Sequence, residues 1–129
     1  MLVVLRTFCG TLAAVQPLLS AHFYATDNGN EPARDWLRGL PREQRQVIGE
    51  DIKTVQFGWP MGMPLVRKLA PALWEVRSVI PGGIARVLFT VSGTSMVLLH
   101  GFLKKSQAMP GVELDTAIAR LLDLRRRLR

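Results

Sequence analysis

The clearest pattern along the chain is a succession of three apolar runs rich in β-branched and aromatic residues. They cover residues 73–77, 84–91 and 96–105. Pro81-Gly82-Gly83 separates the first two runs, and the polar residues 92–95 separate the last two. Runs of this kind, punctuated by Gly, Pro and Ser, are typical of strands joined by tight turns. We therefore predict an antiparallel meander of three strands.

Charged residues occur inside this predicted meander. Arg86 interrupts the second run, Arg77 closes the first, and Lys104 and Lys105 close the third. Side chains alternate across a strand, so Glu75 and Arg77 share one face. A charge is costly to bury unless it is paired. The pattern thus predicts one packed face and one face or rim that carries several cations.

In the rest of the chain, apolar residues recur at the spacing typical of helices. Apolar stripes at helical spacing predict two helices before the meander, over residues 31–40 and 42–57, and one after it, over residues 112–128. Short apolar segments at 22–25 and 65–69 are candidate strands. The fold class is therefore α+β, with a small sheet rich in antiparallel pairs.

Composition narrows the range of partners. A chain of 129 residues with 48% hydrophobic residues fits one domain with one core. Lys and Arg number 17 against 10 acidic residues, a net charge of +7, which favours a polyanionic partner such as nucleic acid or an acidic protein. A single cysteine, Cys9, excludes an internal disulfide, and with two histidines it offers no metal-ligand spacing.

Residues 1–21 do not continue the pattern of the domain. Their apolar stretches are shorter than the roughly 18–20 residues of a membrane span, and Arg6 follows the first stretch instead of preceding it, unlike a secretory signal. We predict a poorly ordered N-terminal extension, a folded domain over residues 22–129, and a cytoplasmic protein with no membrane partner.

The order of the predicted elements, combined with three stretches of sequence, resembles the RelE/HigB superfamily of bacterial toxins. The similarity is greatest to the phage-derived, Gp49-like HigB branch. This resemblance implies a RelE-like fold. The stretches are residues 74–77, 82–89 and 100–107, followed by Pro110, Glu113-Leu114 and Ala117.

This resemblance implies a function. Members of the superfamily are small endoribonucleases that cut messenger RNA, often on the ribosome, and a cognate helix-turn-helix antitoxin neutralises them. They use no metal and no other cofactor. The ribose 2′-hydroxyl attacks the adjacent phosphate, which leaves a 2′,3′-cyclic phosphate or 3′-phosphate and a 5′-hydroxyl.

The resemblance also implies site residues. Glu75 and Arg77 match polar active-site positions on the first strand of the meander, Arg86 matches an arginine on the next, and Lys104 and Lys105 match a basic pair that ends the last strand. Planar guanidinium groups suit phosphate oxygens. The base stays open between a lysine and the Glu75 carboxylate. The alternative interpretation of these charges is structural, as a same-face ion pair and strand-end cations.

Further residues are candidates for holding RNA. Arg67 and Lys68 add two cations near the edge of the same sheet, and Trp59, in a loop rich in Gly and Pro, is a candidate for stacking on an unpaired base. His100 lies in an apolar run beside Gly101, and we interpret it as a residue that packs in the core or supports a catalytic residue, instead of as a general acid. The alternative functions are a basic RNA- or ribosome-binding module without catalysis and a phage-type structural protein.

Overall fold

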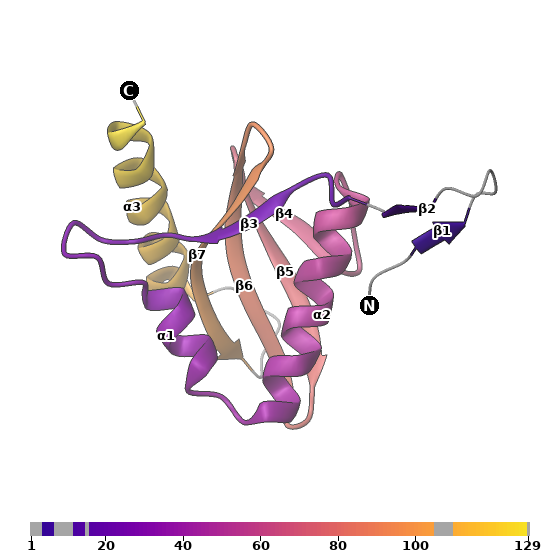
Figure 1. The fold of residues 1–129 in the computed structure, drawn as a ribbon. Helices are drawn as coiled ribbons and strands as arrows, with labels where there is room; N and C mark the ends of the chain where they lie inside the picture. Colours follow the sequence, from indigo (N-terminus) through magenta and orange to yellow (C-terminus); the bar gives the residue numbers. More distant parts are fainter. Residues whose placement is uncertain (1–3, 7–11, 15, 105–109, 129) are drawn as a thin grey trace.

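The structure, a computed structural model, describes residues 4–6, 12–14, 16–104 and 110–128. Its centre is a five-stranded sheet of order β3-β7-β6-β5-β4 (Figure 1), in which β3 runs parallel to β7 and every other pair is antiparallel. The strands are β3 (Ser20–Phe23), β4 (Val66–Ala70), β5 (Leu73–Ile80), β6 (Gly83–Ser92) and β7 (Ser95–Lys104). The helices are α1 (Pro32–Arg38), α2 (Arg42–Gly58) and α3 (Gly111–Arg127).

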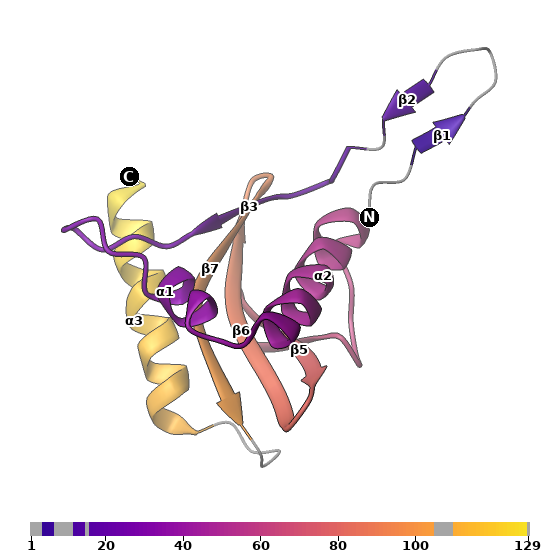
Figure 2. The ribbon, with the colours of Figure 1, turned by 60° about the horizontal axis from the view of Figure 1, so that its bottom comes forward.

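Helices cover both faces of this sheet. α1 and α2 lie on one face, and α3 packs against β7 and β6 on the other (Figure 2). One stripe of α2 is buried against the first face of the sheet and consists of Ile48, Ile52 and Val55. The buried residues of α3, against the other face, are Ala117 and Leu121. The sheet is therefore the middle layer between two hydrophobic clusters, as its amphipathic helices require.

Tight turns join the strands of the meander. Gly82 has φ +90° between β5 and β6, and Gly93 has φ +60° between β6 and β7. Residues with a Cβ rarely adopt this left-handed region, so glycine suits both turns. The predicted α+β class and the meander are confirmed, and 65–69 is indeed the region of a strand, β4.

The N-terminal boundary differs from the predicted one. Leu19 is buried in the core, and the backbone N–H groups of Leu18 and Leu19 donate to the carbonyl oxygen of Gln56 in α2. The folded domain thus takes in residues that we assigned to the extension. Farther upstream, β1 (Val4–Arg6) and β2 (Leu12–Ala14) pair with each other as a separate two-stranded sheet.

An irregularity in β7 changes which side chains face α3. Leu88 of β6 lies opposite His100, whereas Phe89 lies opposite Leu98, so Leu99 is an extra residue on β7. Such a bulge reverses the alternation of side chains beyond it. As a result His100 turns toward α3, and Gly101 lies beneath Trp36 of α1.

Gly101 leaves no room for a larger side chain. A Cβ at this position would lie 2.3 Å from Cε3 of Trp36. We expect Gly101→Ala to lower the free energy of unfolding by about 1–3 kcal/mol, because the indole must shift out of its packed position. Urea unfolding measures this effect. Gly49→Ala is the control, since nothing lies within 4 Å of a Cβ there. Equal stability of the two variants would contradict the close packing of α1 on β7.

A polar cluster fastens the end of α3 to the segment after β3. The hydroxyl of buried Tyr24 donates to Oδ2 of Asp123 at 2.6 Å, and Arg126 and Arg127 both pair with the same carboxylate. The Arg127 guanidinium lies 5.3 Å from the centre of the Tyr24 ring. The hydrogen bond from Tyr24, and then that from Arg127, lowers the pKa of Asp123 to about 2.

This lowered pKa predicts how stability depends on pH. An aspartate whose folded pKa lies below its unfolded value of 3.8 stabilises the fold above that value and loses the effect as pH falls toward 2. We expect Asp123→Asn to be less stable than the wild type at pH 7, with a gap that closes between about pH 5 and pH 2. Urea unfolding across this range measures the gap, and Asp115→Asn, an exposed change on the same helix, is the control. A gap that persists unchanged at pH 2 would contradict the role of the charge.

Candidate active site

Four charged side chains meet on the face of the sheet opposite α1 and α2. Val76 and Val87 are buried in the cluster under these two helices, so their neighbours Glu75, Arg77 and Arg86 point to the other face. Register then brings the residues together: Arg77 lies opposite Arg86, and Arg67 of β4 lies opposite Glu75. We call this surface, formed by Arg67, Glu75, Arg77 and Arg86, the arginine face.

Glu75 is the centre of this group. Its Oε2 lies 2.9 Å from Nε of Arg67 and 3.9 Å from Nε of Arg77, and its Oε1 lies 3.8 Å from Nη1 of Arg86. Three guanidinium groups thus surround one carboxylate, which leaves an excess of about two positive charges. Such an excess on a partly desolvated surface attracts an anion, and guanidinium groups suit phosphate oxygens in particular.

The four side chains differ in their access to solvent. Glu75 and Arg86 have no exposed surface, whereas the side chains of Arg77 and Arg67 are 18% and 35% exposed. Burial lowers the pKa of Arg86, and the neighbouring Glu75 carboxylate acts in the opposite direction. Within the arginine face, Arg77 and Arg67 are therefore the arginines open to solvent, and the charge of Arg86 lies beneath them.

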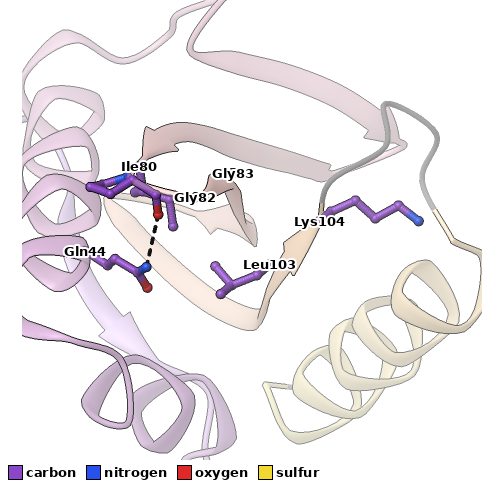
Figure 3. Close-up of a pocket in the computed structure, with 7 residues that line it drawn as sticks. Gln44, Ile80, Gly82, Gly83, Leu103 and Lys104 are labelled. Carbon is purple, nitrogen blue, oxygen red and sulfur yellow. Dashed lines mark hydrogen bonds between the residues drawn. The ribbon is translucent and has the colours of Figure 1, made fainter.

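Lys104, the first of the two predicted lysines, is the last residue of β7. Lys104 is partly buried and pairs with Ile84 of β6, two residues from Arg86. Beyond the bulge its side chain shares the face of His100 and Phe102, and Figure 3 shows it extending away from β7 on the side where α3 lies. Lys105 lies outside the described residues, so its predicted role stays a prediction.

A small pocket opens beside Lys104 at the same end of the sheet. Figure 3 shows its lining, and its volume is about 140 Å³. The amide of Gln44, from the first turns of α2, donates to the carbonyl oxygen of Pro81 at 3.2 Å. Ile80 and Leu103 supply apolar walls. The pocket therefore lies between the first turn of α2 and the end of the sheet where Lys104 is found.

Two predicted RNA contacts lie on the opposite face from the arginines. Trp59 packs edge-on against Trp74 and Phe89, with ring centres 5.0 and 5.6 Å apart, and contributes to the cluster under α1 and α2. The Nζ of Lys68 lies 5.7 Å from the centre of the Trp74 ring. Alternation along β4 explains this placement, because Lys68 follows Arg67 and points the other way. The structure thus separates Trp59 and Lys68 from the other candidates and unites Arg67 with them.

Sequence reasoning missed a second polar group next to the arginine face. Nε2 of His100 lies 2.6 Å from Oε1 of Glu113, and Nη1 of Arg120 lies 3.1 Å from its Nδ1. Arg120 also donates to the carbonyl oxygen of Leu99 at 2.8 Å. Glu113 and Arg120 lie seven residues apart on α3, two helical turns, so both reach the same strand. That spacing was the available signal, but only the bulge turns His100 toward them.

Among the residues that the structure describes, no group of three or more His, Cys, Asp or Glu side chains is arranged to hold a metal ion. Within the same described ranges, no helix is both long enough and apolar enough to cross a membrane.

Residues 35–122 match the family described as phage derived protein Gp49-like, and no curated protein matches the chain. The chain belongs to the Gp49-like family. The match runs from α1 to α3 and includes the whole arginine face. The Gp49-like family is part of the RelE/HigB-type toxin group, and the small α+β fold agrees with it. At this level the protein is a toxin of a toxin–antitoxin pair, which implies an antitoxin as its partner.

Proposed function

We propose that this Gp49-like protein is a metal-independent endoribonuclease that cuts messenger RNA on the ribosome and so inhibits translation. The observation that carries the proposal is the arginine face, where three guanidinium groups surround the Glu75 carboxylate. A site with an excess of fixed positive charge can stabilise a phosphorane without a metal ion. Membership of a toxin family supports the same function.

Each accessible cation has a role in the proposed reaction. The 2′-hydroxyl of one ribose attacks the neighbouring phosphorus, and negative charge gathers on the two non-bridging oxygens. Arg77 and Arg67 bind these oxygens, and Arg86 strengthens the field from beneath. Lys104, on the same face at the end of β7, approaches the 5′-oxygen as it leaves. Glu75 holds the three guanidinium groups in place, which pre-organises the charge before RNA binds.

The proposed partners follow from charge as well as from family. A net charge of +7 favours RNA, the ribosome and an acidic surface on the antitoxin, which we propose to be a helix-turn-helix protein. Association driven by such charge slows with added salt. The alternative function is a basic module that binds RNA or the ribosome without cutting, and it shares every one of these electrostatic properties.

Cleavage of a defined message separates the two functions. Purified protein in excess is mixed with ribosomes stalled on a labelled messenger RNA. EDTA is added after the complexes form, at a concentration that leaves the ribosomes intact. The proposal predicts site-specific cuts, and no or slower cuts without ribosomes. Intact RNA, together with retained binding to ribosomes, would establish the non-catalytic module instead. Cuts that vanish when only the toxin has been treated with chelator would contradict metal independence.

A further inference from the structure

The polar group formed by His100, Glu113 and Arg120 lies on the same side of the sheet as the arginine face. On β7, Phe102 lies opposite Arg86 of β6, and His100 comes two residues before Phe102. The Cα atoms of His100 and Phe102 are therefore roughly 7 Å apart. The rings of His100 and Phe102 stack with centres 5.7 Å apart. Glu113 is in the first turn of α3 and lies against His100. Glu113 and Arg77 therefore share one side of the sheet, with Glu113 beside β7 and Arg77 two strands away on β5.

The hydrogen bonds assign a tautomer to His100. Arginine has only donors, so the Arg120 contact makes Nδ1 the acceptor. The proton must then be on Nε2, where it is donated to Glu113. Both ring nitrogens are thereby engaged by protein groups, and protonation of Nδ1 would break the contact with Arg120. His100 is consequently a poor candidate for moving a proton and a good one for holding Glu113.

Glu113 has the properties that Glu75 lacks. Glu75 has no exposed surface and lies among three guanidinium groups, whereas the Glu113 side chain is 27% exposed. The interaction with His100 uses Oε1, which leaves Oε2 for a substrate.

We propose that Glu113 is the general base of the cleavage reaction and that His100, held by Arg120, positions it. This proposal rests on the proposed ribonuclease function and names the group which that function left open. The 2′-hydroxyl gives its proton to Glu113 as its oxygen bonds to phosphorus. The bond from phosphorus to the 5′-oxygen breaks, and this oxygen keeps the electron pair and takes a proton from solvent. Glu113 then returns its proton to solvent.

Single-turnover cleavage of ribosome-bound messenger RNA tests the base, with RNA binding and thermal unfolding measured separately. We expect Glu113→Gln to slow cleavage by roughly 100- to 10,000-fold, the usual contribution of a general base, with binding kept. Arg125→Ala, an exposed change near the end of the same helix, is the control and keeps the rate. If Glu113→Gln does not fold, Glu113→Asp keeps the charge and shortens the side chain, and is also expected to be slow.

The positioning role of His100 has its own test. In His100→Gln, the side-chain amide nitrogen can occupy the place of Nε2 and donate to Glu113. The side chain of His100→Asn is too short for its amide nitrogen to reach that place. We expect Gln to retain most of the rate and Asn to lose it. Wild-type rates in Glu113→Gln or Glu113→Asp would overturn the assignment of the base while cleavage itself stands. Wild-type protein that cuts nothing would overturn the ribonuclease function, and this proposal with it.

Discussion

Arg77→Ala is expected to slow single-turnover cleavage by roughly 100- to 1000-fold, the typical loss when one donor to a transition-state charge is removed. Arg77 is one of the two accessible arginines of the arginine face, with 18% of its side chain exposed. Phosphorane charge exceeds that of the ground-state phosphate, so we expect RNA affinity to fall far less than the rate. The measurement compares rate and affinity for the same ribosome-bound message.

Two variants place this result in context. Arg86→Ala should also slow cleavage far more than it weakens binding, through loss of the buried charge, and it should lower stability as well. Arg125→Ala, on the exposed end of α3, should weaken binding slightly and leave the chemical step unchanged. If Arg77→Ala loses rate and affinity in equal proportion, Arg77 only docks the RNA.

The second large effect concerns the stability of the arginine face itself. Glu75→Ala removes the carboxylate that neutralises Arg86, a side chain with no exposed surface. Breaking a buried ion pair from one side typically costs about 3–5 kcal/mol, and we expect a loss of this size in urea unfolding. Glu31→Ala, which removes one member of an exposed pair with Arg34, is the control and should cost less than about 1 kcal/mol.

A double substitution separates charge from packing. Glu75→Leu combined with Arg86→Met fills the same space with apolar groups, and such replacements are often neutral or stabilising. We therefore expect the double variant to recover most of the stability lost in Glu75→Ala, while cleavage stays low because the buried charge is gone. Full activity in the double variant would show that the arginine face is structural.

The sequence predicted the arginine face because a period of two is a strong signal in strands. Alternation alone placed Glu75 and Arg77 on one face, and the charge of Arg86 within an apolar run marked its position. The same rule, applied to Arg67 and Lys68, would have separated them, since neighbours on a strand point to opposite faces. Trp59 was harder to place, because its loop shows no periodicity from which packing against Trp74 and Phe89 follows.

The pattern of apolar and polar positions in the sequence could not predict the polar group around His100. Its orientation depends on the extra residue Leu99, and nothing in a continuous apolar run marks where a bulge occurs. The partners Glu113 and Arg120 come from a helix whose position on the sheet is set by tertiary packing. In the same way, burial of Leu19 depends on contacts with α2, far along the chain, so the start of the domain could not be read locally.

The central claim is that the protein cuts messenger RNA through the ribose 2′-hydroxyl on the arginine face. The most direct test is a message with a single 2′-deoxy nucleotide at a mapped cleavage site, presented on the ribosome. The account predicts that cleavage at that site disappears, while binding and cleavage at other sites continue, and that products of the unmodified message carry a 5′-hydroxyl. Undiminished cleavage at the deoxy position, or products with a 5′-phosphate, would show that water attacks the phosphate directly and would contradict the account.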